Sequence, residues 1–398
     1  MSKNFVNELR PELVGIHGLS PLSSFNSASR NYMFSSHIGQ RLSLDNPDSK
    51  TIVSGVENKF AKYTFDIRMP EDGKIIKIIK RYPEGVGLNA LRHNPQTLVV
   101  YESEKDRTVN CFSIKEFTSY HQTFGFQYRH TDKLSLLSPG RFIPKDTVFS
   151  TPPSVGENSE FMMGVNPNVA FMGIPSVSED GIMVSEDYLE KLSFHTYERR
   201  SNQFGASKFP LNLYGDANTY KPFPEIGDYV REDGVLMALR DYDTDLSITD
   251  MSVFTTREID HTFDTILYTK AGKGKVVDIR VINNPGAPNK TPSVIKSYVE
   301  KYSTALKSFY KELTQLDNEL RFESKRRYGT ESVRYGEELH RQLVEAYSIM
   351  NVAGKRYRQP LNLLYRNYTL DEYMVEFVIE YKVTPTKGFK LSDFYGGL

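Results

Sequence analysis

Alternating and continuous apolar patterns along most of the chain predict a protein built largely of strands. Residues 63–69 and 110–117 alternate between apolar and polar positions, which is the pattern of half-buried strands. Residues 169–172 and 182–184 are short continuous apolar runs, which are typical of strands covered on both faces. Further strands are expected between residues 200 and 290 and at residues 373–383.

The period changes after Thr291 and Pro292, which together offer an N-cap and a first-turn proline. Apolar residues then recur at alternating gaps of four and three, the spacing of a heptad seam. They are Ile295, Val299, Tyr302, Leu306, Phe309, Leu313, Leu316 and Leu320, and a second helix carries Leu339, Leu343, Ala346 and Met350. Gly329 and Gly336 lie between the two sets, so the sequence predicts an antiparallel helical hairpin that serves packing.

By contrast, residues 22–31 are rich in Ser and Asn, which predicts a loop held by side-chain hydrogen bonds. The expected fold class is therefore α+β, mostly β.

Composition limits the classes of function. A chain of 398 residues should hold two or three subdomains, and 39% hydrophobic residues suffice for real cores. Lys plus Arg and Asp plus Glu are both 50, so nucleic-acid contacts must come from local patches or partner chains. The single Cys111 predicts a reducing environment. Since no apolar run approaches the roughly eighteen residues of a membrane span and no signal peptide is recognisable, we expect an intracellular protein without a membrane partner.

Two acidic groups are candidates for chemistry. Glu179 and Asp180 adjoin the apolar runs, where paired carboxylates need a cation or a donor, although a surface turn is equally compatible. Asp241, Asp243 and Asp245 stand at alternate positions and could converge on Mg²⁺ if the backbone turned tightly. Thr244 stands where a glycine would be wanted, so a solvated acidic loop is favoured.

Neither the eight histidines nor the lone cysteine shows the spacing of a zinc site. Two basic clusters, at residues 325–327 and 355–358, could contact phosphate, but such runs are more often solvated surface.

Four segments carry a resemblance to a known family. They are residues 29–41 (SRNYMFSSHIGQR), 143–148 (IPKDTV), 164–186 (GVNPNVAFM, then EDGIMVSE) and 388–397 (GFK, then GG). In this order they resemble motifs of the β (second-largest) subunit of multisubunit DNA-dependent RNA polymerases. Their divergence is closest to the split β subunits of giant-bacteriophage polymerases.

The chain also departs from the family pattern. Residues 173–178 replace an aromatic-rich run before Glu179, and Phe394 and Tyr395 stand where the last motif has Arg and His. The second lysine of that motif would lie beyond Leu398, so the resemblance implies that another chain completes it.

The resemblance implies a part of a double-psi β-barrel with an inserted flap. The implied divisions are a fork-like loop region (1–50), a β-rich connecting or hybrid-binding region (51–160), the first part of the barrel (161–200), a flap-like domain (201–290), the helical hairpin (291–352), and a return strand that ends within the lysine-bearing motif (353–398).

The resemblance also implies roles for individual residues. Glu179 and Asp180 would face a nucleotide-borne Mg²⁺ through water, and Lys390 would lie near the RNA 3′ end. Contacts to nucleotide or nucleic acid would come from Arg30, Asn31, Gln40 and Arg41. The Mg²⁺ ions themselves would be held mainly by the β′ chain.

The implied activity is nucleotidyl transfer by a multi-chain enzyme, with no activity of this chain alone. The implied partners are β′, other β fragments, template DNA and RNA, and a promoter-specificity factor at the flap. The implied location is the cytoplasm of an infected bacterium, or a virion. Two alternatives remain: a non-catalytic structural or assembly protein with a β-subunit-like fold, and a hydrolase that uses Asp241, Asp243 and Asp245.

Overall fold

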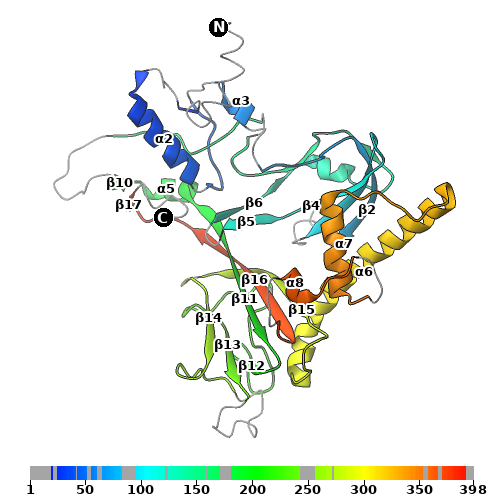
Figure 1. Cartoon of the computed structure of the whole chain (residues 1–398). Helices are drawn as coiled ribbons and strands as arrows, with labels where there is room; N and C mark the ends of the chain where they lie inside the picture. Colours follow the sequence, from blue (N-terminus) through cyan, green and yellow to red (C-terminus); the bar gives the residue numbers. More distant parts are fainter. Residues whose placement is uncertain are drawn as a thin grey trace.

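A computed structural model describes the protein over most of its length. The described residues are 19–20, 25–41, 43–51, 55–60, 65–82, 96–121, 124–156, 159–170, 181–242, 256–270, 273–352, 357–365 and 370–390. Over these ranges the protein is a mixed α+β structure in which strands predominate (Figure 1). The predicted class is confirmed at that level.

The helices and strands have the following bounds. The helices are α2 (Ala28–Gln40), α3 (Glu57–Phe60), α5 (Glu186–Leu189), α6 (Ser293–Tyr328), α7 (Glu337–Ile349) and α8 (Leu361–Leu364). The strands are β1 (Ile67–Arg68), β2 (Gly73–Lys80), β3 (Thr97–Ser103), β4 (Val109–Ile114), β5 (Phe117–His121), β6 (Phe124–Gln127), β7 (Arg129–His130), β8 (Phe142–Ile143), β9 (Val148–Thr151), β10 (Gly181–Met183), β11 (Phe194–Phe204), β12 (Lys208–Pro210), β13 (Val235–Asp241), β14 (Thr265–Tyr268), β15 (Lys275–Asn283), β16 (Tyr373–Val383) and β17 (Gly388–Lys390).

Strand β3 is covered on both faces of the sheet β4-β3-β2-β8. Its side chains alternate between the faces, as strand geometry requires. Leu98 and Val100 lie in a core cluster with Phe309 of α6, whereas Val99 and Tyr101 lie in a separate cluster. This double coverage explains why residues 98–101 of β3 are continuously apolar rather than alternating.

The sheet β11-β16-β15 crosses the middle of the molecule (Figure 1). Its central strand, β16, pairs with β11 along all eleven residues of each strand, from Phe194 opposite Val383 to Phe204 opposite Tyr373. Strand β15 pairs with the other edge of β16. The buried side of this sheet shares a core cluster with β13, the central strand of the sheet β12-β13-β14.

The predicted pair of helices is present and forms α6 and α7. Seven of the eight predicted seam residues of α6 are buried, and Leu320 is partly buried. Residues Leu339 and Leu343 of α7 lie in the same cluster as the middle of α6. Gly329 ends α6 in the left-handed conformation, with φ of 73°, which glycine adopts without strain.

The start of α6 differs from the prediction. The helix begins at Ser293 with Pro292 in the cap position, and no side chain caps it. The Thr291 hydroxyl instead donates to the buried Glu372 carboxylate at 2.7 Å. Thr291 therefore joins the helix start to the residue that precedes β16.

The Ser- and Asn-rich segment is only partly a loop, because Ala28–Gln40 form helix α2. The Ser27 hydroxyl accepts a hydrogen bond from the Arg30 backbone N–H at 3.3 Å, which satisfies one of the free donors at a helix start. The polar residues that suggested a loop thus cap a helix.

Strands β5 and β6 pair with each other and pack against β11. Phe117 stacks on Tyr197 with ring centroids 4.8 Å apart, so aromatic packing joins this hairpin to the central sheet. None of the helices within the described ranges is both long enough and apolar enough to cross a membrane.

Candidate functional site

Two motif segments from distant parts of the sequence form one strand pair. Strand β10 pairs antiparallel with β17, with Gly181 opposite Lys390, Ile182 opposite Phe389 and Met183 opposite Gly388 (Figure 1). The pairing continues one residue further, because the Val184 N–H donates to the Lys387 carbonyl at 2.9 Å. The segment that follows Glu179 and Asp180 therefore lies directly beside the lysine-bearing segment.

Glu179 and Asp180 themselves lie outside the described residues. The structure describes their next neighbour in sequence, Gly181, whose backbone pairs with that of Lys390. The structure thus pairs Gly181, which directly follows the two carboxylates in sequence, with Lys390.

The long β11–β16 ladder accounts for this pairing. After β10 the chain forms the short helix α5 and enters β11, while β16 leads directly into β17. Between the two ladders, Lys387 forms an ion pair with Glu186, and Lys382 pairs with Glu190 at 2.9 Å. Because β11 and β16 pair over their whole length, β10 and β17 emerge from the same end of the sheet.

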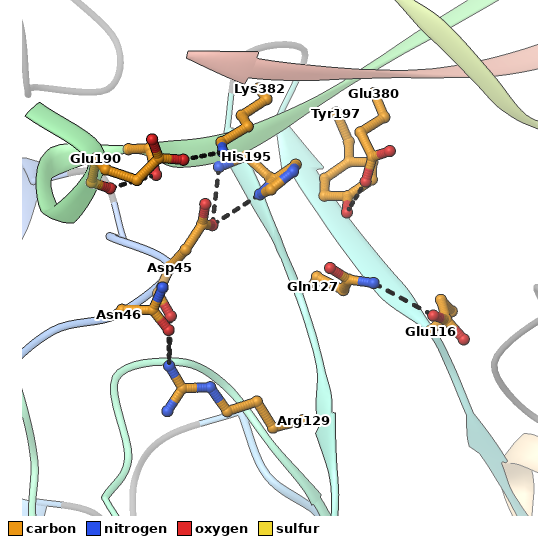
Figure 2. A network of polar contacts seen from close by, with 11 residues as sticks. Asp45, Asn46, Glu116, Gln127, Arg129, Glu190, His195, Tyr197, Glu380 and Lys382 are labelled. Carbon is orange, nitrogen blue, oxygen red and sulfur yellow. Dashed lines mark hydrogen bonds and ion pairs between the residues drawn. The ribbon is translucent and has the colours of Figure 1, made fainter. Parts of the chain in front are cut away.

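A polar network surrounds this end of the sheet (Figure 2). The Asp45 Oδ1 atom accepts hydrogen bonds from His195 Nδ1 at 2.8 Å and from the His195 backbone N–H at 3.1 Å. The hydrogen bond from Asp45 raises the pKa of His195, since the carboxylate stabilises the imidazolium form. The N-terminal segment is thereby held against the first residues of β11.

Arg129 of β7 extends the network to the neighbouring sheet. Its guanidinium donates to the backbone carbonyl of Asp45 and to the Asn46 side chain. On the other side, the Tyr197 hydroxyl donates to Glu380 at 2.7 Å, so β11 and β16 are also joined through side chains. Burial and the nearby Glu380 carboxylate both raise the pKa of Tyr197.

The Gly-x-Asn part of the third motif contacts the same N-terminal segment. The Asp48 N–H donates to the Gly164 carbonyl at 2.6 Å, and the Asn166 N–H donates to the Asp48 carboxylate at 3.0 Å. The Asn166 side-chain amide donates to the Ser49 carbonyl at 2.7 Å. Gly164 and Asn166 therefore fix residues 48–49 in place.

The predicted nucleic-acid contacts lie on or beside α2. Arg30 and Gln40 are exposed on this helix, and Asn31 is half-buried next to Arg30. The Arg30 guanidinium lies 3.8 Å from the sulfur of Met33, one turn along. The helix thus presents Arg30 and Gln40 at the surface.

Arg41 differs from the other three because its side chain lies over the ring of Phe161, 5.0 Å from the ring centroid. Burial lowers the pKa of Arg41 to about 10, and its Nε atom has no hydrogen-bond partner among the described residues. In this structure Arg41 packs against the small apolar cluster of Leu19, Val56 and Phe161.

The alternate aspartates are only partly described. Asp241 ends β13 and lies 3.9 Å from Lys208, whereas Asp243 and Asp245 lie outside the described residues. In the part of the chain that the structure describes, no group of three or more His, Cys, Asp or Glu side chains could hold a metal ion.

Sequence patterns did not reveal the network of Asp45, Arg129 and His195. These residues come from an irregular segment and from two strands, with no fixed spacing between them. Only the tertiary structure brings them together.

Comparisons with known proteins leave the family open. Neither a scan of protein-family models nor a search of curated proteins found a match to this chain.

Proposed function

We propose that the chain is a fragment of the β subunit of a multisubunit DNA-dependent RNA polymerase, inactive by itself and active only with its partner chains. The pairing of β10 with β17 carries this proposal. In the family that the motifs resemble, the Glu-Asp segment and the Gly-x-Lys segment belong to one barrel and serve one site. A strand pair between these segments is the arrangement that such a site requires.

The finer fold follows from the same proposal. Strands β10, β17 and the adjoining ends of β11 and β16 would contribute to a double-psi β-barrel that other chains complete. The sheet β12-β13-β14 would form the flap-like domain, while β15 returns to the central sheet beside β16. The pair α6 and α7 would be an insertion before the chain re-enters the barrel.

The proposed chemistry rests on charge placed around a nucleotide. Glu179 and Asp180 would face a Mg²⁺ that arrives on the nucleotide phosphates, and their negative charge would offset the cation through bound water. Lys390 would stabilise the negative charge that develops on the phosphate being transferred. The metal-binding residues would belong mainly to β′, so this chain would supply electrostatic support to the reaction.

The surface of α2 would serve nucleic acid. Arg30 and Gln40 are exposed there, and an arginine fork suits phosphate oxygens. We assign Arg30, Asn31 and Gln40 to contacts with the nucleotide or the nearby backbone. Arg41, whose guanidinium lies over the ring of Phe161, would anchor the end of α2 that carries Gln40.

The test is a double substitution, Glu179→Gln with Asp180→Asn, in the polymerase reconstituted with its partner chains. The chain offers a matched control, because Glu232, Asp233 and Gly234 repeat the same tripeptide at a turn before β13. We expect the first pair of substitutions to slow single-nucleotide addition by about a hundredfold without loss of assembly. The same substitutions at Glu232 and Asp233 should leave the rate unchanged.

An unchanged rate of nucleotide addition in the Glu179 and Asp180 variant would contradict the catalytic role. A chain that assembles with polymerase subunits but tolerates these substitutions would instead fit a non-catalytic structural protein with the same fold. Catalysis by the isolated chain would contradict the proposal in another way, since it would require a complete metal site on this chain.

A further inference from the structure

A polar cavity of about 560 Å³ lies between β11, the connection from β4 to β5, and α7. Six basic side chains line it, namely Arg81, Lys115, Arg199, Arg200, Arg280 and Arg341. Four acidic side chains line the same cavity. The net charge of the lining side chains is therefore positive, although most of the cations are paired with carboxylates.

Two of the arginines are neutralised in the wall of the cavity. Arg81 forms a two-pronged contact with Asp278, with distances of 2.7 and 2.9 Å. Arg280 pairs with Glu345 of α7 and lies 3.5 Å from Glu376. These pairs join β15 to the neighbouring elements and account for three of the four acidic side chains.

Two more arginines have their own carboxylates. Arg200 pairs with the buried Glu198, and its Nε lies 2.7 Å from that carboxylate. The Arg341 guanidinium donates to both carboxylate oxygens of Glu338, the fourth acidic side chain of the lining, at 2.8 and 2.6 Å. All four acidic groups of the lining are thus engaged.

Lys115 and Arg199 are the cations that remain. Neither forms a hydrogen bond or an ion pair with any residue that the structure describes. Both side chains line the same cavity. Burial and the positive charge of Arg199 lower the pKa of Lys115, and the Glu338 carboxylate partly offsets this effect. Glu338, the carboxylate nearest in effect to Lys115, is itself bonded to Arg341, so the two remaining cations can attract an anion to the cavity.

We propose that Lys115 and Arg199 form a binding site for a phosphoryl group, free or carried by a nucleotide. An ammonium group and a guanidinium fork together suit the several oxygens of a phosphate dianion. The volume lies within the range of small-molecule sites. This inference does not depend on the proposed polymerase function, because it rests only on the charges that line the cavity.

The number of remaining cations favours a small ligand over a nucleic-acid strand. The other four basic side chains of the lining are paired with carboxylates, whereas an extended strand needs a row of free cations for its successive phosphates. A single phosphoryl group needs only the corner formed by Lys115 and Arg199.

The experiment is calorimetric titration of the full chain with inorganic phosphate, with ADP and with a short single-stranded oligodeoxynucleotide. We expect phosphate or ADP to bind, and Lys115→Gln combined with Arg199→Gln to weaken binding by about tenfold or more. Tighter binding of ADP than of phosphate would identify a nucleotide as the source of the phosphoryl group, and equal binding would identify the free anion. Lys105→Gln, at an exposed turn between β3 and β4, is the matched control and should bind like the wild type.

Thermal unfolding of each variant without ligand shows whether it is folded, and Lys115→Arg, which keeps the charge, should retain most of the affinity. The inference is overturned if the wild type binds neither phosphate nor ADP. It is also overturned if the folded double variant binds as the wild type does, or if the oligonucleotide binds more tightly than ADP.

Discussion

The contact between Asp45 and His195 should control how firmly the N-terminal segment is held against the central sheet. Asp45→Ala removes both hydrogen bonds that His195 donates to this carboxylate. Asp45→Asn keeps one acceptor oxygen but removes the charge. Asp187→Asn is the control, because Asp187 is exposed on α5 nearby and takes no part in the contact.

The magnitude follows from the two hydrogen bonds and their exposure. A hydrogen bond to a charged group contributes about 1.5–3 kcal/mol. The side chains of His195 and Asp45 are 21% and 19% exposed, so solvent screening reduces that contribution. We expect Asp45→Ala to destabilise the local contact by about 2 kcal/mol and Asp45→Asn by about 1 kcal/mol.

The effect should depend on pH in a defined direction. The hydrogen bond to Asp45 raises the pKa of His195 above its usual value of 6.5, so the folded protein binds the imidazolium proton more tightly than the unfolded chain does. The stabilisation is therefore complete below the usual pKa and is lost as the pH rises through the raised pKa. In Asp45→Asn this dependence should be strongly reduced.

Amide hydrogen exchange measures the local opening of this contact. Peptides that cover residues 43–50 should exchange roughly thirtyfold faster in Asp45→Ala at low pH, and the ratio of the variant rate to the wild-type rate should fall as the pH rises. Asp187→Asn should exchange as the wild type does. An equal ratio at all pH values, or a wild-type pH dependence in Asp45→Asn, would refute the assignment to a charged His195.

Two further perturbations test the fold. Cysteines introduced together at Ile182 and Phe389, which are opposite each other, should form a disulfide under mild oxidation, because directly paired strand positions lie within bridging distance. A higher disulfide yield from cysteines at Val184 and Phe389 would contradict the register. Phe309→Ala, at a fully buried position of α6, should lower the free energy of unfolding in urea by roughly 3–5 kcal/mol. The control is Phe322→Ala, at an exposed position of the same helix, which should change the free energy of unfolding by less than about 0.5 kcal/mol. Equal effects of the two substitutions would contradict the packing of α6.

Local patterns predicted the parts of the fold that local interactions determine. The seam of α6 was predictable because each of its residues is three or four positions from the next, so one face of the helix collects them. The end of α6 at Gly329 was predictable because glycine readily adopts the left-handed conformation. Helix α2 was missed, because a serine that caps a helix and a serine that stabilises a loop use the same hydroxyl in the same way.

The candidate site depends on contacts that no local pattern encodes. The motif resemblance implied catalytic roles for Glu179, Asp180 and Lys390, but the pairing of Gly181 with Lys390 follows from the β11–β16 ladder. The link between Asp45 and His195 had no sequence signal, since a single carboxylate and a single histidine far apart in the chain have no characteristic spacing. Long-range pairing therefore supplies the information that composition and periodicity lack.

The tripeptide Glu-Asp-Gly occurs three times in the sequence, at residues 71–73, 179–181 and 232–234. At residues 232–234, Asp233 pairs with Arg231 at 2.8 Å and accepts a hydrogen bond from the Val235 N–H at 3.1 Å, while Gly234 turns the chain with φ of 77°. At residues 71–73, the Glu71 carboxylate accepts a hydrogen bond from the Ser103 hydroxyl at 2.9 Å, and Gly73 pairs with Ser103 in the sheet. At residues 179–181, the glycine pairs with Lys390. Identical residues thus enter different structures, and the lysine-bearing partner strand, more than the tripeptide itself, marks residues 179–181 as the candidate for chemistry.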